Sequence, residues 1–151
     1  TKPIVDCILP EGDFNQATGA LASVGLGDVP SWLRPFNALS NGQQFRAGLA
    51  RLVTEAPNEV VVDEFTSVID RQIAKVGALA FGKNWRRNKG KKVVLLSCHY
   101  DIIEWLQPDW VYDVNTKVLK KKAILENDQK LSSKFGRSTE LTGSFLKSIT
   151  I

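Results

Sequence analysis

The sequence EVVVDEFTSVID, residues 59–70, decides the fold class. Its three consecutive valines, preceded by Pro57 and Asn58, predict a short strand that is buried on both faces of a parallel sheet. Asp63 and Glu64 stand at the carboxyl end of this strand, where ligands bind in open α/β sheets. Phosphate chemistry uses such a pair: one acid holds Mg²⁺, and the other orients or deprotonates a water. The alternative interpretation is a buried strand that runs into an acidic helix cap.

Length and composition are those of a globular protein. With 151 residues, 43% hydrophobic and 24% charged, the chain predicts one domain or a large part of one. No apolar run approaches ~20 residues, so we expect no membrane span, and no signal peptide opens the chain. A net charge of +4 suits a partner that carries phosphate.

The cysteine spacing indicates the redox environment of the chain, and the absence of methionine indicates how the chain arose. Cys7 and Cys98 show neither metal-ligand nor disulfide-framework spacing, which favours a reduced chain in the cytoplasm. The sequence contains no methionine and begins at Thr1. We therefore expect it to be a piece of a longer product, or a processed one.

Helical patterns come before the acidic strand. Residues 1–10 look extended, and Asp13 then caps a helix that ends near Gly25. In LSNGQQFRAGLARL, residues 39–52, the apolar spacing predicts a helix from about residue 42 to about 55. Ser40 and Gln43 have capping-box spacing at its start. This is either a well-capped amphipathic helix or, with Gly42 and the first free amides, an anion site at a helix N-terminus.

A third helix begins at Asp70 and ends near Gly82. Its last part, GALAFGKN at residues 77–84, matches the first seven positions of the phosphate-loop pattern. That loop follows a strand and opens a helix, whereas this segment closes one. It also has Asn84 where Mg²⁺ requires a hydroxyl. We therefore do not interpret it as a phosphate loop.

Residues 83–92, KNWRRNKGKK, form the densest basic run of the chain. It is interpreted as a solvated connection between a helix and a strand. The alternative is a nucleic-acid or phosphate patch in which Trp85 stacks on bases.

A second buried strand, residues 93–96, leads to His99, the only histidine of the chain. Asp101 then starts a short helix that Pro108 ends. Further strands are predicted at residues 110–114 and 118–119. A lone histidine is more often structural than catalytic, so its position at a strand end matters only together with the other motifs.

Taken together, the sequence Leu-Ser-Asn-Gly-Gln, a helix and an apolar strand ending in Asp-Glu resemble the C-terminal half of an ABC-type ATPase domain. The family's signature is Leu-Ser-Gly-Gly-Gln, and here Asn41 replaces the first glycine. Asparagine tolerates the positive φ values that glycine often serves, so this departure is mild. The resemblance covers roughly residues 2–116.

The resemblance implies a role for each matching position. Asp63 would coordinate Mg²⁺, and Glu64 would be the general base for the attacking water. His99 would be the switch histidine that contacts the γ-phosphate region. Residues 67–70 resemble the D-loop, normally Ser-Ala-Leu-Asp, with Asp70 contacting the partner subunit. The signature residues, which would contact ATP, are Ser40, Asn41, Gly42 and Gln43.

Residues 99–110 and the sequence Leu-Arg-Pro at residues 33–35 narrow the resemblance. They look like the ABC-type ATPases associated with GNAT-type acetyltransferases. No acetyltransferase segment is recognisable in the chain.

We therefore predict an α/β fold with the mostly parallel sheet of a P-loop NTPase and a small helical portion. Residues 1–119 would be the C-terminal half of the ATPase domain, divided into a helical and signature portion (1–56) and core strands and helices (57–119). Residues 120–151 would form a basic tail rich in serine and threonine, without an assigned role. The Walker A half, with its phosphate loop and lysine, is absent from these 151 residues.

The predicted function is ATP binding and Mg²⁺-dependent hydrolysis at a head-to-tail dimer interface. The partner would be a second copy of the chain or the missing N-terminal half, and the chain alone would be inactive. The alternative is a non-catalytic, truncated relative that binds nucleic acid through residues 83–92, or binds a protein. The sequence does not say which process the hydrolysis drives.

Overall fold

The computed structural model describes residues 2–122 and 147–150. The chain divides into two compact units. The first comprises Thr1–Glu59 and Val68–Lys91, and the second comprises Val60–Ser67 and Lys92–Ile151. Helices and strands are both present, so the predicted mixed α/β class is confirmed. Most of the predicted tail, residues 120–151, lies outside the described residues.

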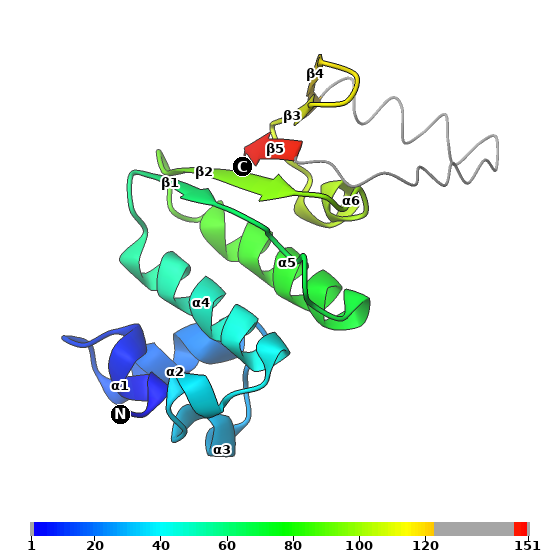
Figure 1. The fold of residues 1–151 in the computed structure, drawn as a ribbon. Coiled ribbons are helices and arrows are strands. Elements are labelled where there is room, and N and C mark those ends of the chain that lie inside the picture. The colour runs from blue at the N-terminus through cyan, green and yellow to red at the C-terminus, as the bar shows by residue number, and fades with distance from the viewer. Residues whose placement is uncertain (1, 123–146, 151) are drawn as a thin grey trace. The chain divides into compact units, whose positions relative to one another are not determined.

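The described part of the first unit is helical (Figure 1). In chain order its elements are α1 (Ile4–Ile8), α2 (Phe14–Ser23), α3 (Val29–Trp32), the 3-10 helix η1 (Phe36–Ala38), α4 (Asn41–Glu55) and α5 (Arg71–Trp85). The extended N-terminus expected from the sequence is wrong, because residues 4–8 form α1. Ile4, Val5 and Ile8 share one helical face and are buried there, which favours the helix over an extended chain.

The predicted helix caps are confirmed. The Asp13 carboxylate accepts a hydrogen bond from the Gln16 amide at 2.7 Å at the start of α2. Ser40 and Gln43 form the reciprocal capping box of α4. Helix α5 continues three residues beyond the predicted end at Gly82, because Trp85 is buried on the same face as Phe81.

Helices α4 and α5 pack closely at Gly77. A Cβ atom placed on Gly77 would lie 2.7 Å from Cε1 of Phe45, whereas one on Gly48 would meet nothing within 4 Å. Glycine at position 77 therefore lets the ring of Phe45 approach the backbone of α5. This contact fixes α4, which carries the predicted signature, against α5.

Gly77→Ala is expected to lower the free energy of unfolding by about 1–2 kcal/mol, because overpacking outweighs the helix propensity that alanine adds. Gly48→Ala in α4 is the matched control. It is expected to raise the same free energy by up to about 1 kcal/mol, since its added methyl group would meet no side chain or neighbouring element within 4 Å. Urea denaturation of both variants measures the two changes. A stabilising Gly77→Ala would contradict the packing described.

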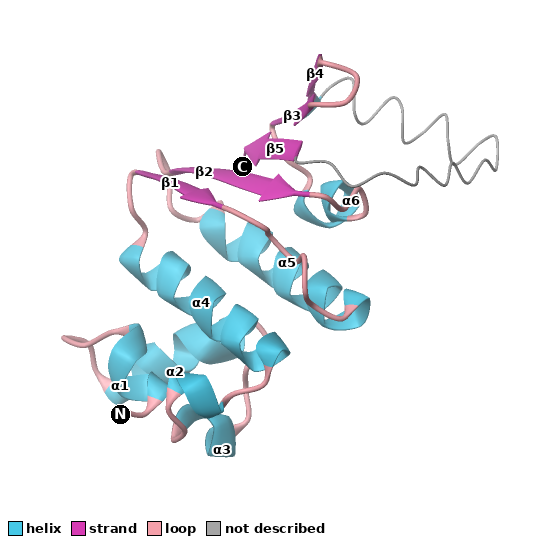
Figure 2. Cartoon of the chain, viewed as in Figure 1, coloured by secondary structure: helices cyan, strands magenta, loops and turns pink. Residues whose placement is uncertain are grey.

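The second unit contains one sheet with the strand order β1-β2-β5-β3-β4 (Figure 2). The strands are β1 (Glu59–Val62), β2 (Lys92–Ser97), β3 (Trp110–Asp113), β4 (Val118–Lys121) and β5 (Lys147–Thr150), with the short helix α6 (Ile102–Leu106) after β2. The strands expected at residues 93–96, 110–114 and 118–119 are confirmed as β2, β3 and β4.

The strand directions differ from the expected mostly parallel sheet. Figure 1 shows β1 and β2 pointing the same way. The pairs β2·β5, β3·β5 and β3·β4 are antiparallel. The physical reason is β5, which lies between β2 and β3 and runs opposite to both. It comes from residues 147–150, to which the sequence analysis assigned no strand.

Strand β1 lies at one edge of this sheet. The expectation that it is buried on both faces is wrong, because its four residues alternate between exposed and half-buried. Val61 is 63% exposed. The run of valines therefore supplies a strand whose only described neighbour is β2.

None of the helices in the described residues has the length and the apolar character of a membrane span.

Candidate functional site

The two candidate catalytic acids lie in the loop that follows β1. Both Asp63 and Glu64 are exposed. One carboxylate oxygen of Asp63 accepts a hydrogen bond from the Glu64 amide at 2.8 Å. Glu64 has a φ of 50° and Thr66 a φ of 66°, in the left-handed region that side-chain-bearing residues rarely adopt. Such backbone persists where the surroundings hold it.

Phe65, between these two residues, holds the loop. Its amide donates to the carbonyl oxygen of Leu96 at 2.8 Å. Its own carbonyl oxygen accepts a hydrogen bond from the Ser97 hydroxyl, also at 2.8 Å. Phe65 and Ser97 are both buried, at 2% and 0% exposure. The loop that carries Asp63 and Glu64 is thus fixed to the end of β2.

The same hydroxyl joins His99 to this arrangement. The His99 amide donates to the Ser97 Oγ at 3.2 Å. The His99 ring is half-buried, and its Nδ1 lies 3.5 Å from the Sγ of Cys98. The structure therefore brings the segments of Asp63, Glu64 and His99 together within the second unit. Carboxylates hold metal ions and an imidazole moves protons, so these joined segments carry side-chain types suited to phosphate chemistry.

The acids fit the magnesium ion that the sequence implies. No cluster of three or more His, Cys, Asp or Glu side chains suited to a metal ion occurs in the described parts of the chain. Mg²⁺ does not require one, because it keeps several waters and binds one or two carboxylates together with substrate phosphates. Asp63, with one oxygen engaged by the Glu64 amide, retains a second oxygen for such a contact.

The signature residues lie at the N-terminus of α4, in the first unit. The Ser40 amide donates to the Gln43 side-chain oxygen at 3.0 Å, and the Gln43 amide donates to the Ser40 Oγ at 3.3 Å. The Gln43 side chain also donates to the Ser31 Oγ at 2.7 Å. These bonds leave the amides of Asn41 and Gly42 facing the end of the helix without a partner among the described residues. The helix end thus presents the free donors that an anion requires.

Gly42 has a second, purely structural role. A Cβ atom at this position would lie 3.0 Å from Cδ1 of Ile73, in the first turn of α5. The N-terminal ends of α4 and α5 are therefore in contact. Asp70 caps α5 here, and its carboxylate accepts hydrogen bonds from the amides of Gln72 and Ile73 at 2.9 and 3.3 Å. The predicted D-loop aspartate is an N-cap as well as a candidate subunit contact.

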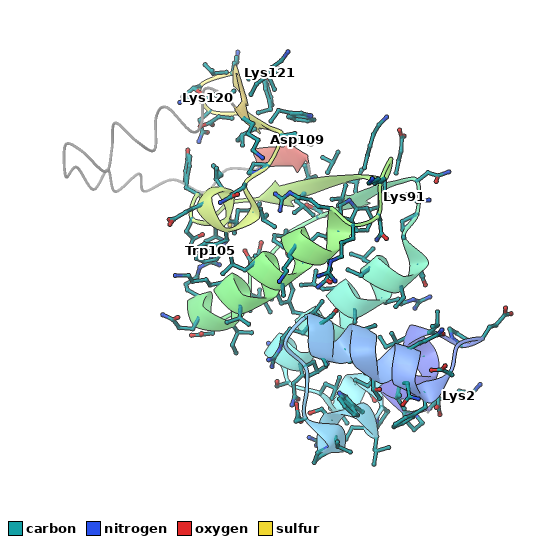
Figure 3. The ribbon with its side chains drawn as sticks, turned by 180° about the vertical axis from the view of Figure 1, so that it is seen from behind. Lys2, Lys91, Trp105, Asp109, Lys120 and Lys121 are labelled. Carbon is teal, nitrogen blue, oxygen red and sulfur yellow. The ribbon has the colours of Figure 1, made fainter. Side chains whose placement is uncertain are left out.

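The basic run at residues 83–92 lacks the stacking aromatic that the sequence suggested. Trp85 is 1% exposed and packs beside Phe81, with 5.5 Å between the ring centroids. Lys83 and Gly82 lie inside the continuous helix α5, which agrees with rejecting a phosphate loop there. Lys91, labelled in Figure 3, donates to the Asn58 side-chain oxygen at 2.6 Å. These contacts favour a solvated connection.

Nucleic-acid affinity of the chain is therefore expected to be weak, and to change by less than about twofold when Lys91 and Lys92 become alanine. A protein that neutralises several phosphates loses affinity steeply as salt rises, and each removed contact lowers that slope by about one. Fluorescence titrations with single-stranded DNA at several salt concentrations measure both quantities. Tight, salt-dependent binding that the double substitution weakens would restore the nucleic-acid interpretation.

Sequence analysis missed two hydroxyl groups that organise these sites. Ser97 connects the acidic loop to His99, and Ser31 holds the Gln43 side chain. A serine at a predicted buried position of a strand is the signal that points to Ser97, since a buried hydroxyl requires hydrogen-bond partners. Ser31 has no comparable signal, because its partner lies twelve residues away on another helix.

Comparisons with known proteins find similarity to several curated ATP-binding proteins. The chain is 31% identical over 109 residues to the energy-coupling factor transporter ATP-binding protein of Levilactobacillus brevis. This alignment covers 72% of this chain and 37% of the relative. It is 36% identical over 66 residues to a methionine import ATP-binding protein of Acinetobacter baylyi, or 44% of this chain and 19% of the relative. A phosphonates import ATP-binding protein of Synechococcus is 35% identical over 66 residues, or 44% of this chain and 24% of the relative.

The chain spans between about a fifth and two fifths of the length of these curated relatives. No family model matches the chain. No solved structure matches it either. The similarity to several ATP-binding proteins supports an ABC-type nucleotide-binding domain.

Proposed function

We propose that this chain is the C-terminal part of an ABC-type ATPase domain and supplies half of a site that hydrolyses ATP. The observation that carries the proposal is the hydrogen-bonded link between the loop of Asp63 and Glu64 and the backbone of His99. This link joins the backbone segments that carry two acids and an imidazole, and groups of this kind serve the attack of water on a phosphate. The similarity to ATP-binding proteins supports the same conclusion.

Each residue has a distinct task in this proposal. Mg²⁺, when bound with ATP, neutralises charge on the phosphate oxygens. Asp63 would hold the ion. Glu64 orients the attacking water and accepts its proton, and His99 contacts the γ-phosphate region. Both acids are exposed, so a nucleotide is able to reach them.

The signature serves a second nucleotide site. Ser40 and the free amides of Asn41 and Gly42 would bind phosphate oxygens of an ATP held mainly by another subunit, with Gln43 maintaining the helix end. Asp70 would contact that subunit. A head-to-tail dimer then places each signature against the other subunit's nucleotide. On the basis of residues 33–35 and 99–110, we also assign the chain to the ABC-type ATPases associated with GNAT acetyltransferases. In this proposal, residues 1–119 form the C-terminal half of the ATPase domain, and the protein is located in the cytoplasm.

A chimera tests the proposal. In it, the matched segment of the Levilactobacillus brevis relative is replaced by the corresponding part of this chain. We expect the chimera to bind MgATP and to dimerise on binding, as measured by isothermal titration and light scattering. The unaltered relative is measured alongside. A folded chimera that binds no nucleotide would contradict the proposal.

A further inference from the structure

Ser97 is the buried centre of the carboxylate-histidine arrangement. Its side chain is fully buried, at 0% exposure, at the last position of β2. A serine hydroxyl has one hydrogen to donate, and Ser97 gives it to the Phe65 carbonyl oxygen at 2.8 Å. Its oxygen accepts the His99 amide at 3.2 Å. One side chain thus bonds the loop after β1 and the loop after β2.

The backbone around Phe65 depends on this bond. Glu64 and Thr66, on either side of Phe65, both have positive φ values, of 50° and 66°. Residues other than glycine adopt that conformation only at a cost, which the surroundings must offset. Two hydrogen bonds at Phe65, from its amide to the Leu96 carbonyl oxygen and from the Ser97 hydroxyl to its own carbonyl oxygen, help to offset this cost. Without Ser97, the loop loses a hydrogen bond that joins it directly to the last residue of β2.

From this geometry we propose that Ser97 is a positioning residue, which sets the distance between the Glu64 carboxylate and the His99 imidazole through the backbones of their two loops. Ser97 does not touch the nucleotide in this scheme. It keeps a general base and a phosphate-contacting group in register, and misplacement by about 1 Å at such groups is able to cost about 10²-fold in rate. The inference rests on the proposed ATPase function for its kinetic part only.

Hydrogen exchange tests the positioning itself, on the 151-residue chain and without ATP. Ser97→Ala is expected to speed exchange of the His99 amide about tenfold, because its acceptor is lost. Amides of residues 63–67 are expected to exchange faster as well, while those of Val93 and Leu95 in β2 keep their protection. Ser97→Thr retains the hydroxyl and is expected to keep slow exchange at His99. Ser23→Ala, which removes a hydroxyl bonded to Ala20 within α2, is the matched control and should alter none of these amides.

Two exchange results would overturn the inference. One is unchanged protection of His99 in Ser97→Ala. The other is an equal loss of protection throughout β2, which would show that Ser97 only stabilises the strand.

The rate of phosphate release by the chimera tests whether this positioning matters for ATP hydrolysis. Ser97→Ala is expected to lower the maximal rate of phosphate release about 10-fold to 100-fold, with the half-saturating ATP concentration unchanged and the rate recovered by Ser97→Thr. An unchanged maximal rate would overturn the positioning role. If no chimera hydrolyses ATP at all, the proposed function fails, and the exchange data still decide whether Ser97 positions the two loops.

Discussion

Glu64→Gln is expected to lower ATP turnover by about 10²–10⁴-fold while leaving MgATP affinity nearly unchanged. The substitution keeps the shape of the side chain and removes its ability to accept a proton, and positioned proton-transfer groups typically contribute a factor of that size. Glu64 is exposed at the end of β1, and its carboxylate has no hydrogen bond within the described residues, so the loss should reflect chemistry instead of folding. Single-turnover hydrolysis and nucleotide titration on the chimera measure the two quantities.

Glu104→Gln provides the matched control for this experiment. Glu104 lies on α6 in the same unit, and it is also exposed. The same chemical change at that position should leave turnover within about twofold. If the Glu64→Gln variant hydrolyses ATP as fast as the unsubstituted chimera, Glu64 is not the general base.

The second large effect concerns the edge strand. The 151 residues by themselves are expected to show no measurable ATPase activity and not to remain a clean monomer. Strand β1 has β2 as its only described neighbour, and Val61 is 63% exposed on it. An exposed apolar edge strand favours pairing with another chain. Size-exclusion chromatography with light scattering, beside a phosphate-release assay, tests both statements.

Lysine substitutions on the two edge strands, made one at a time, show which edge of the sheet mediates self-association. Val61→Lys on β1 is expected to shift the chain towards monomer, because lysine disfavours edge-to-edge pairing. Val118→Lys on β4 is the matched control, since β4 forms the opposite edge and Val118 is 43% exposed. It should leave self-association unchanged. A stable monomer that hydrolyses ATP would show that the chain contains a phosphate site of its own.

The helices of the first unit follow from local sequence signals. Asp13, Ser40 and Asp70 each have a short polar side chain directly before an apolar periodic segment, and each caps the predicted helix. These signals lie within four residues of the helix start, so no distant contact is needed to interpret them. Residues 4–8 lack such a cap, and only the burial of their apolar face produces α1.

The sheet was harder to predict because strand pairing depends on distant residues. A run of valines in residues 60–62 has the composition of a buried parallel strand, but burial depends on which strands lie beside it. Strand β5 pairs with β2 from about fifty residues further along the chain and reverses the expected direction. The acids were predicted from their position at a strand end, and the role of the histidine was predicted from the resemblance to ABC-type ATPases. The Ser97 hydrogen bonds that connect their segments could not be predicted, because Ser97 and Phe65 are 32 residues apart in the sequence.

Phosphate release by the chimera is the most direct test of the central claim that this chain supplies the acids and the histidine of an ATPase site. With MgATP in excess, the chimera is expected to release phosphate, and the rate should depend on Mg²⁺ and fall about 10²-fold or more in Glu64→Gln. A chimera that folds and binds MgATP, yet releases no phosphate above the level of its Glu64→Gln variant, would contradict the claim.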